Sequence, residues 1–179
     1  VQGFRYFKQG TRTVDDAGLV QVDSAYYAAL PAAPHSEVTV RIFERSLEIL
    51  DGTGQLLRRH EKATRKGSFE MQPADRLFNP SRETRHILAQ AKAIGADAAR
   101  LCELLFAIEG RVGQRKLWGI VSLAQRYPRR LVNSACARAL ADGIYSYRHV
   151  KLATERLVTE ALRMRPDRII VGETRGEEV

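Results

Sequence analysis

The period of the hydrophobic pattern changes once along this chain, near Asn79-Pro80, and this change constrains the fold more than any other feature of the sequence. Before it, apolar residues alternate with polar ones, as at Val38, Val40 and Ile42, which is typical of strands with one buried face. After it, apolar residues recur about every 3.6 positions, which is typical of amphipathic helices. We therefore predict an α+β protein in which the strands precede the helices.

Short extended runs separated by turn residues fill positions 11–65. We expect a hairpin that pairs 12–14 with 19–22 across the turn at 15–18. Further strands are expected at 25–30, 37–43, 46–50 and 55–60, with a tight turn at Asp51-Gly-Thr-Gly54 before the last of them. Strands this short and numerous predict a small antiparallel β-barrel, which we place in residues 1–78.

Five short helices, each with one apolar stripe, are expected in residues 79–163 as an antiparallel array. Their boundaries follow from capping residues and helix breakers. These are a start at Ser81-Arg-Glu-Thr84, a break at Gly95, a cap at Asp97, Pro128 in the first turn of the fourth helix, an end at Asp142-Gly143, and a fifth start near Ser146. Residues 164–179 leave the helical pattern and form an atypical tail.

The net charge of +8 belongs almost wholly to the helical segment. Residues 1–78 carry +1 and residues 164–179 carry −1, whereas residues 79–163 carry +8. Within it, positions 110–141 contain no acid but seven cations: Arg111, Arg115, Lys116, Arg126, Arg129, Arg130 and Arg138. A surface of this kind attracts polyanions because each neutralised phosphate releases counterions. We predict a DNA-contacting surface here; the alternative is an ordinary solvated face of a basic protein.

A second basic cluster lies on the last predicted strand and the loop after it. It consists of Arg58, Arg59, Lys62, Arg65 and Lys66. Contacts with a DNA backbone are one interpretation. Protection of an exposed sheet edge against aggregation is the other, because charged side chains discourage strand pairing.

No arrangement of residues predicts catalysis, a metal site or a cofactor. The aspartates at 15, 16, 23, 51 and 75 lie in turns or short strands and are interpreted as turn formers, and the four histidines lack ligand spacing. The sequence contains no GxxxxGK[ST] phosphate-binding loop. Cys102 and Cys136 fall on apolar helix faces and are expected in the core. Core packing is also the favoured interpretation of Tyr6, Phe7, Tyr26, Tyr27, Phe43 and Trp118 over base stacking.

Four phrases of the sequence together resemble the C-terminal region of IstA-type insertion-sequence transposases over about residues 1–160. They are Gly10-Thr-Arg-Thr-Val14, Val22-Asp-Ser-Ala-Tyr-Tyr27, Ile49-Leu-Asp-Gly-Thr-Gly-Gln-Leu-Leu57 and Tyr145-Ser-Tyr-Arg-His-Val150. The resemblance implies a Mu-like transposase whose β-barrel follows a metal-dependent DDE catalytic domain, and which works with an AAA+ helper ATPase. The catalytic carboxylates have no counterparts here and would lie upstream of Val1. A start at Val rather than Met suggests a fragment.

The end of the chain resembles a different family. The stretch Leu157–Glu178 is similar to the Walker B segment of type II and type IV secretion ATPases, with Glu173 at the position of that family's glutamate. The resemblance implies a gene fusion or truncation in which this tail is poorly packed and without function.

The leading hypothesis is a non-catalytic module of an insertion-sequence transposase that binds transposon-end duplex DNA and supports transpososome assembly. Its partners would be DNA, other transposase subunits and a helper AAA+ ATPase, with no cofactor and no membrane. The alternatives are a fragment of a secretion ATPase and a protein-interaction module without DNA contact. No signal peptide or membrane span is predicted, so we expect a cytoplasmic location.

Overall fold

The computed structural model describes residues 6–164. It divides into two compact units, which are treated separately below. The first unit comprises Val1–Ile87 with Leu104–Arg115, and the second comprises Leu88–Glu103 with Lys116–Val179. These units group residues that lie close together in space. The domain limits predicted from the sequence, 1–78, 79–163 and 164–179, follow the change in secondary structure instead. They stay a prediction.

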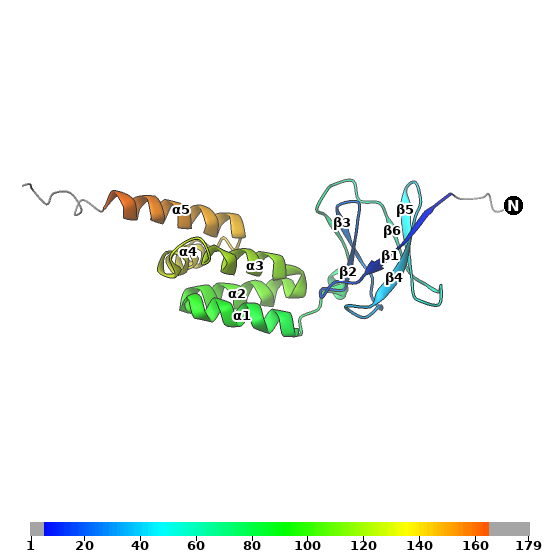
Figure 1. The fold of residues 1–179 in the computed structure, drawn as a ribbon, viewed down its shortest axis with the longest axis horizontal. Coiled ribbons are helices and arrows are strands. Elements are labelled where there is room, and N and C mark those ends of the chain that lie inside the picture. The colour runs from blue at the N-terminus through cyan, green and yellow to red at the C-terminus, as the bar shows by residue number, and fades with distance from the viewer. Residues whose placement is uncertain (1–5, 165–179) are drawn as a thin grey trace, which may run out of the picture. The chain divides into compact units, whose positions relative to one another are not determined.

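Four strands of the first unit form an antiparallel sheet (Figure 1). In spatial order they are β1 (Lys8–Thr13), β4 (Glu37–Ile42), β5 (Ser46–Leu50) and β6 (Leu56–Glu61). Along β4, Val38 and Val40 are buried as the alternation predicts. The turn predicted at Asp51 is confirmed, because its carboxylate accepts hydrogen bonds from the Thr53 and Gln55 backbone N–H groups, both at 2.9 Å.

The other three strands form a second sheet, in the order β2 (Leu19–Val22), β3 (Ala25–Ala28) and β7 (Phe69–Glu70). The predicted hairpin between 12–14 and 19–22 is wrong. Strand β1 pairs with β4, with Arg12 opposite Val38, and β2 forms its hairpin with β3 instead. The Asp15 carboxylate accepts from the Ala17 and Leu19 backbone N–H groups and closes the predicted turn. Before it, Val14 bonds to the segment that leads into β4, because its N–H donates to the Ser36 carbonyl at 2.9 Å and its carbonyl accepts from the His35 N–H at 2.8 Å.

The two sheets share one hydrophobic core, but no hydrogen-bonded closure into a barrel is found among the strands of residues 6–164. Val20 and Tyr27 from one sheet pack in the same cluster as Val38, Leu47 and Ile49 from the other. The sequence indicated short strands with one buried face correctly. It could not indicate whether the sheet edges would pair.

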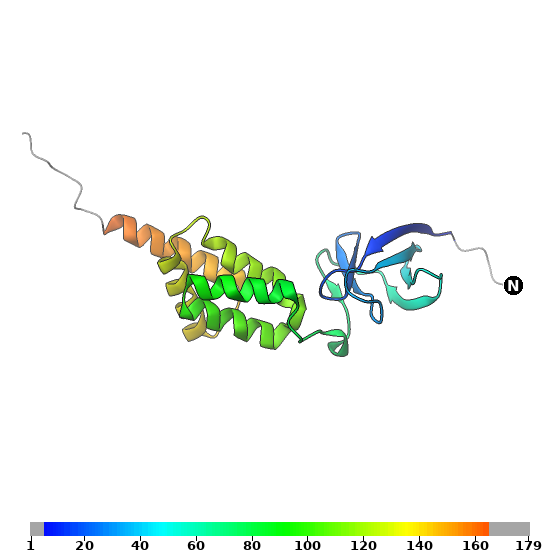
Figure 2. The same cartoon turned by 60° about the horizontal axis from the view of Figure 1, so that its bottom comes forward.

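Helices follow from residue 82 onward. They are α1 (Arg82–Ile94), α2 (Ala96–Glu109), α3 (Gln114–Leu123), α4 (Arg129–Asp142) and α5 (Tyr147–Arg163). Short 3-10 turns lie before α1, at Pro73–Asp75, and between α2 and α3, at Gly110–Gly113. Figure 2 shows the same ribbon from a second direction. Most predicted boundaries are confirmed: Ser146 caps α5 through the His149 N–H, and Gly143 ends α4 in a left-handed conformation with φ 67°.

The predicted cap of α2 is wrong. Asp97 lies inside the first turn, and the carbonyl oxygen of the Asn133 side chain, reaching over from α4, accepts from the Asp97 and Ala98 N–H groups at 3.0 and 3.1 Å. The Asn133 amide also donates to the Asp97 carboxylate at 2.9 Å. A Cβ at Gly95 would collide with the Asn133 side chain, which explains why glycine precedes this helix.

The core of the second unit is built from the predicted apolar stripes. Leu101, Leu117, Ile120 and Val132 are fully buried. Cys102 and Cys136 are buried free thiols, which confirms the prediction that they are core residues. Burial raises the pKa of both thiols to about 12.

In the part of the chain that the structure describes, no helix has both the length and the apolar character needed to cross a membrane. Apart from the first residues of Leu157–Glu178, the tail resemblance, including Glu173, lies outside the described residues.

Candidate nucleic-acid interface

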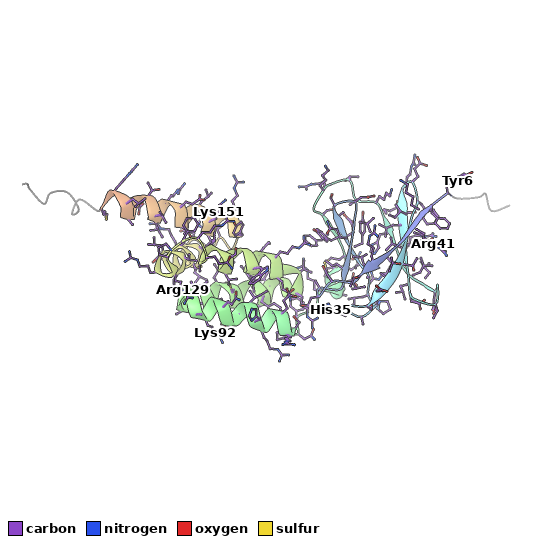
Figure 3. The ribbon with its side chains drawn as sticks, in the orientation of Figure 1. Tyr6, His35, Arg41, Lys92, Arg129 and Lys151 are labelled. Carbon is purple, nitrogen blue, oxygen red and sulfur yellow. The ribbon has the colours of Figure 1, made fainter. Side chains whose placement is uncertain are left out.

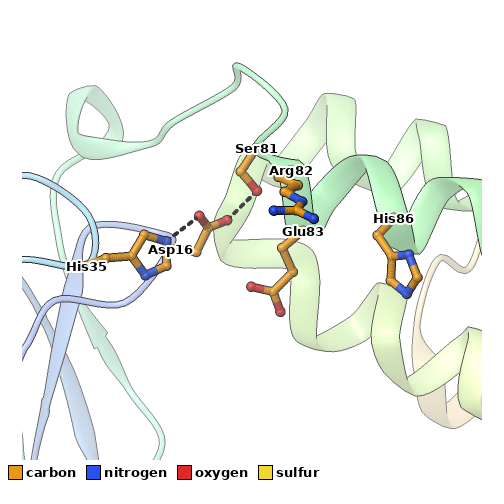
Figure 4. A pocket seen from close by; sticks show the side chains of 6 residues that line it. All are labelled: Asp16, His35, Ser81, Arg82, Glu83 and His86. Carbon is orange, nitrogen blue, oxygen red and sulfur yellow. Dashed lines mark hydrogen bonds and ion pairs between the residues drawn. The ribbon is translucent and has the colours of Figure 1, made fainter.

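A buried carboxylate, Asp16, organises one end of the first unit (Figure 4). It lies in the loop between β1 and β2, and it accepts hydrogen bonds from the Ser81 hydroxyl at 2.5 Å and the Gln114 amide at 2.6 Å. His35 contacts its other oxygen at 3.1 Å. Burial alone would raise the pKa of Asp16. The hydrogen bonds from Ser81, Gln114 and His35, together with the Arg111 charge, outweigh that effect and hold the pKa below its ordinary value.

Arg111 belongs to this network rather than to the surface. Its side chain is only 10% exposed and lies 3.7 Å from the Asp16 carboxylate. The guanidinium also donates to the backbone carbonyls of Asn79, at 2.8 Å, and Asp16, at 3.1 Å. The first cation of the acid-free segment is therefore occupied with holding the loop before α1 against the β1–β2 loop.

Arg115, the next cation, lies against an aromatic ring of the same unit. Its guanidinium carbon is 4.1 Å from the centroid of the Tyr26 ring, and the group donates a hydrogen bond to the Tyr26 hydroxyl. This is a cation–π contact at an exposed position.

The cluster on β6 is partly neutralised. Arg58 forms an ion pair with buried Asp75 and donates to the Leu30 carbonyl at 2.8 Å. Burial would raise the pKa of Asp75, but the Gln72 N–H and the Arg58 guanidinium hold it below its ordinary value. Arg59 pairs with Glu48 across the β5–β6 ladder.

The remaining members of that cluster follow the strand. Lys62 is half-buried, and Arg65 and Lys66 are exposed in the segment that leads to β7. Strand β6 is an edge of its sheet. The placement therefore fits edge protection and backbone contact equally well.

Three arginines gather around the start of α4 in the second unit. Arg126 lies in the turn after α3, and Arg129 and Arg130 are the first two residues of α4. All three are exposed. Arg129, labelled in Figure 3, donates to the Ala93 carbonyl at 3.5 Å. The N-cap Pro128 provides no side-chain hydrogen bond, and the first turn of α4 has no acid. Arg138 is exposed further along α4, and Lys116 is exposed on α3.

The sequence reasoning missed several residues with structural roles. Asp16 and Asp75 are more than turn formers, because both are buried and hold arginines. The core interpretation fails for Tyr6, Phe7 and Trp118, which are 89%, 46% and 45% exposed. No local pattern marked these aspartates, because their arginine partners lie 17 and 95 positions away along the chain. In the described part of the chain, no three His, Cys, Asp or Glu side chains are grouped to hold a metal ion.

Comparison with known proteins shows what the strand-rich part of the chain is similar to. Residues 1–71 match the family described as Mu transposase, C-terminal domain. A protein described as the transposase of insertion sequence IS408 from Burkholderia multivorans is 28% identical over 137 residues, which cover 73% of this chain and 26% of that protein. No solved structure matches.

A relative of another kind also matches. A protein described as a conjugal transfer protein from Mycobacterium tuberculosis is 36% identical over 129 residues, covering 58% of this chain and 35% of that protein. The similarity covers 58% of the chain, which is more than residues 1–71 make up, so part of it lies outside the matched domain. The chain thus spans about a third or less of the length of these relatives. The match of residues 1–71 to the Mu transposase C-terminal domain agrees with the resemblance to insertion-sequence transposases that the sequence predicted.

Proposed function

We propose that this chain is a non-catalytic module of an insertion-sequence transposase that binds transposon-end duplex DNA and supports transpososome assembly. Its partners are the DNA, other transposase subunits and a helper AAA+ ATPase. The match of residues 1–71 supports a transposase module. The DNA contact is supported mainly by one feature of the second unit.

That feature is the start of α4, where two arginines occupy a position that helices normally give to acids. The unpaired N–H groups at a helix start carry a partial positive charge, so a cation there costs about 0.3–1 kcal/mol of stability. Arg129 and Arg130 both incur this cost, and no capping side chain relieves it. A local rule broken in this way is typical of functional sites. A phosphate group would relieve the repulsion and accept hydrogen bonds from both the arginines and the helix N–H groups.

The surroundings of these arginines differ from those of other cations in the second unit. Lys92 lies 3.8 Å from Glu103, and Lys151 lies 3.9 Å from Glu155. Among the described residues, no acid pairs with Arg126, Arg129 or Arg130. We therefore expect these three to contact DNA phosphates, while Lys92 and Lys151 have partners that compete with DNA.

The test is fluorescence anisotropy with a labelled blunt duplex at several salt concentrations. The logarithm of the binding constant should fall steeply and linearly with the logarithm of the salt concentration. The triple replacement of Arg126, Arg129 and Arg130 by alanine should weaken binding and make the slope shallower by about 2–3, because each lost phosphate contact removes roughly 0.9.

The matched control is the double replacement of Lys92 and Lys151 by alanine, which also removes exposed charge. It should change the slope by less than about 1. Slope changes in proportion to the charges removed, three against two, would mean that only net charge matters. An unchanged affinity in the triple variant would remove the α4 start from the proposal and leave a protein-interaction module.

The conjugal transfer relative favours a second candidate, a fragment of a secretion ATPase. Its similarity reaches beyond the matched domain, and the final stretch of the sequence resembles that family. Such a fragment would differ from the transposase module in responding to ATP.

A further inference from the structure

Three side chains of the first unit are stacked on one another at the surface. The Tyr26 and Phe69 rings have centroids 5.0 Å apart and planes 20° from parallel. The Arg115 guanidinium lies 4.1 Å from the centroid of the Tyr26 ring. We propose that this stack is a binding platform for the unpaired bases of single-stranded DNA, a site separate from the duplex-binding arginines at the start of α4.

Strand register places the platform on one sheet face. Tyr26 on β3 is the partner of Phe69 on β7 and of Gln21 on β2. Because side chains alternate between faces, these three form a row across the sheet. Tyr27, the next residue, points to the opposite face and is buried in the core shared by the two sheets.

Other side chains cover one end of this sheet face, whereas the row of Gln21, Tyr26 and Phe69 is accessible to solvent. Leu19 and Ala28 are buried there, with Met71 and Val112 packed against them. At the row this cover ends: Phe69 is 42% exposed and Gln21 is exposed. A flat ring that is stacked on one side and open to water on the other gains stability when another flat group covers it.

The chemistry around the row fits an unpaired nucleotide. Every base presents a π face, so a base can extend the stack that Arg115, Tyr26 and Phe69 begin. Arg65 and Lys66 are exposed and precede Phe69 by only four and three positions. They offer positive charges to a sugar–phosphate backbone that follows the stacked bases. The acid next to Phe69 on β7, Glu70, alternates to the other face and accepts a hydrogen bond from Ser68 at 3.1 Å.

An unpaired strand suits this surface better than a duplex does. In a duplex the base faces are already stacked on each other, and only their edges are open in the grooves. A sheet carrying exposed aromatic rings instead recognises bases that are splayed apart. The amide of Gln21 can then hydrogen-bond the edge of a stacked base.

The test uses the 179-residue chain and a fluorescent oligothymidylate of about 15 nucleotides, which has little structure of its own. Replacing Phe69 by alanine should weaken binding roughly 5- to 150-fold, as expected for loss of one stacked base. Phe69→Trp, which keeps a flat ring, should restore it. Phe78→Ala is the matched control, because Phe78 is 51% exposed and belongs to the same unit.

The outcomes separate this site from the duplex site. Loss of oligothymidylate binding in Phe69→Ala but not in Phe78→Ala, with blunt-duplex binding and its salt slope unchanged, supports the platform. Equal oligothymidylate affinity in the wild type and Phe69→Ala overturns it, as does absence of binding by the wild type. Neither result depends on whether the arginine variants of α4 lose duplex binding.

Discussion

At the residue scale, Asp16 shows how one buried carboxylate can hold several segments together. Asp16 lies in the loop between β1 and β2. Within the first unit, its carboxylate accepts hydrogen bonds from Ser81, before α1, and from Gln114, at the start of α3. We expect Asp16→Ala to lower the free energy of unfolding by about 1–3 kcal/mol, because buried donors lose their acceptor.

The effect of Asp16→Ala should depend on pH in a defined direction. The folded pKa of Asp16 lies below the ordinary value of 3.8, so its stabilising contribution is present above that value and is lost as pH falls through the folded pKa. Urea unfolding of both proteins should show the full difference at pH 5 and a smaller one near pH 3. The control Glu44→Ala, at an exposed turn, should change stability by less than about 0.5 kcal/mol. A difference that grows on acidification would contradict the assignment.

At the element scale, the start of α2 depends on a side chain from α4. Asn133→Ala should lower the free energy of unfolding by about 0.5–2 kcal/mol, the usual cost of removing a helix cap, because the Asp97 and Ala98 N–H groups lose their acceptor. Thermal or urea unfolding measures this. Ser134→Ala, next to it but exposed on α4, should have little effect. Similar losses in both variants would mean that the cap contributes nothing specific.

The start of α4 should show stability and binding changing in opposite directions. Replacing Arg129 and Arg130 by glutamate puts acids where the helix dipole favours them, so the free energy of unfolding should rise by about 0.3–1 kcal/mol per residue. Duplex binding should weaken more than in the alanine variants, because repulsion is added. The two measurements are urea unfolding and anisotropy on the same samples. A variant that loses both stability and binding would show that these arginines have a structural role.

At the scale of the whole molecule, the two candidate functions differ in their response to nucleotide. The sequence lacks a phosphate-binding loop, so isothermal titration with Mg–ATP should give no heat of binding, and ATP should leave duplex affinity unchanged at constant ionic strength. The same titration with a salt of equal ionic strength is the control. Saturable ATP binding would favour the secretion-ATPase fragment over the transposase module.

Much of the local structure could be read from the sequence. The change of period near Asn79, the turn at Asp51 and the ends of α4 and α5 are each set by residues close together in the chain, through side-chain periodicity, turn chemistry and capping. For the same reason, the acid-free segment could be recognised before any fold was known.

Only the tertiary structure decided which distant groups meet. Long-range pairing put β1 beside β4, brought Phe69 against Tyr26, and placed Asn133 at the start of α2. It also divided the predicted DNA-binding residues, because Arg58 and Arg111 are held by Asp75 and Asp16 while Arg129 and Arg130 stay exposed. The sequence determines which side chains carry charge and which faces are apolar. Whether a charge is neutralised internally depends on a partner far along the chain, and local patterns hold no information about that partner.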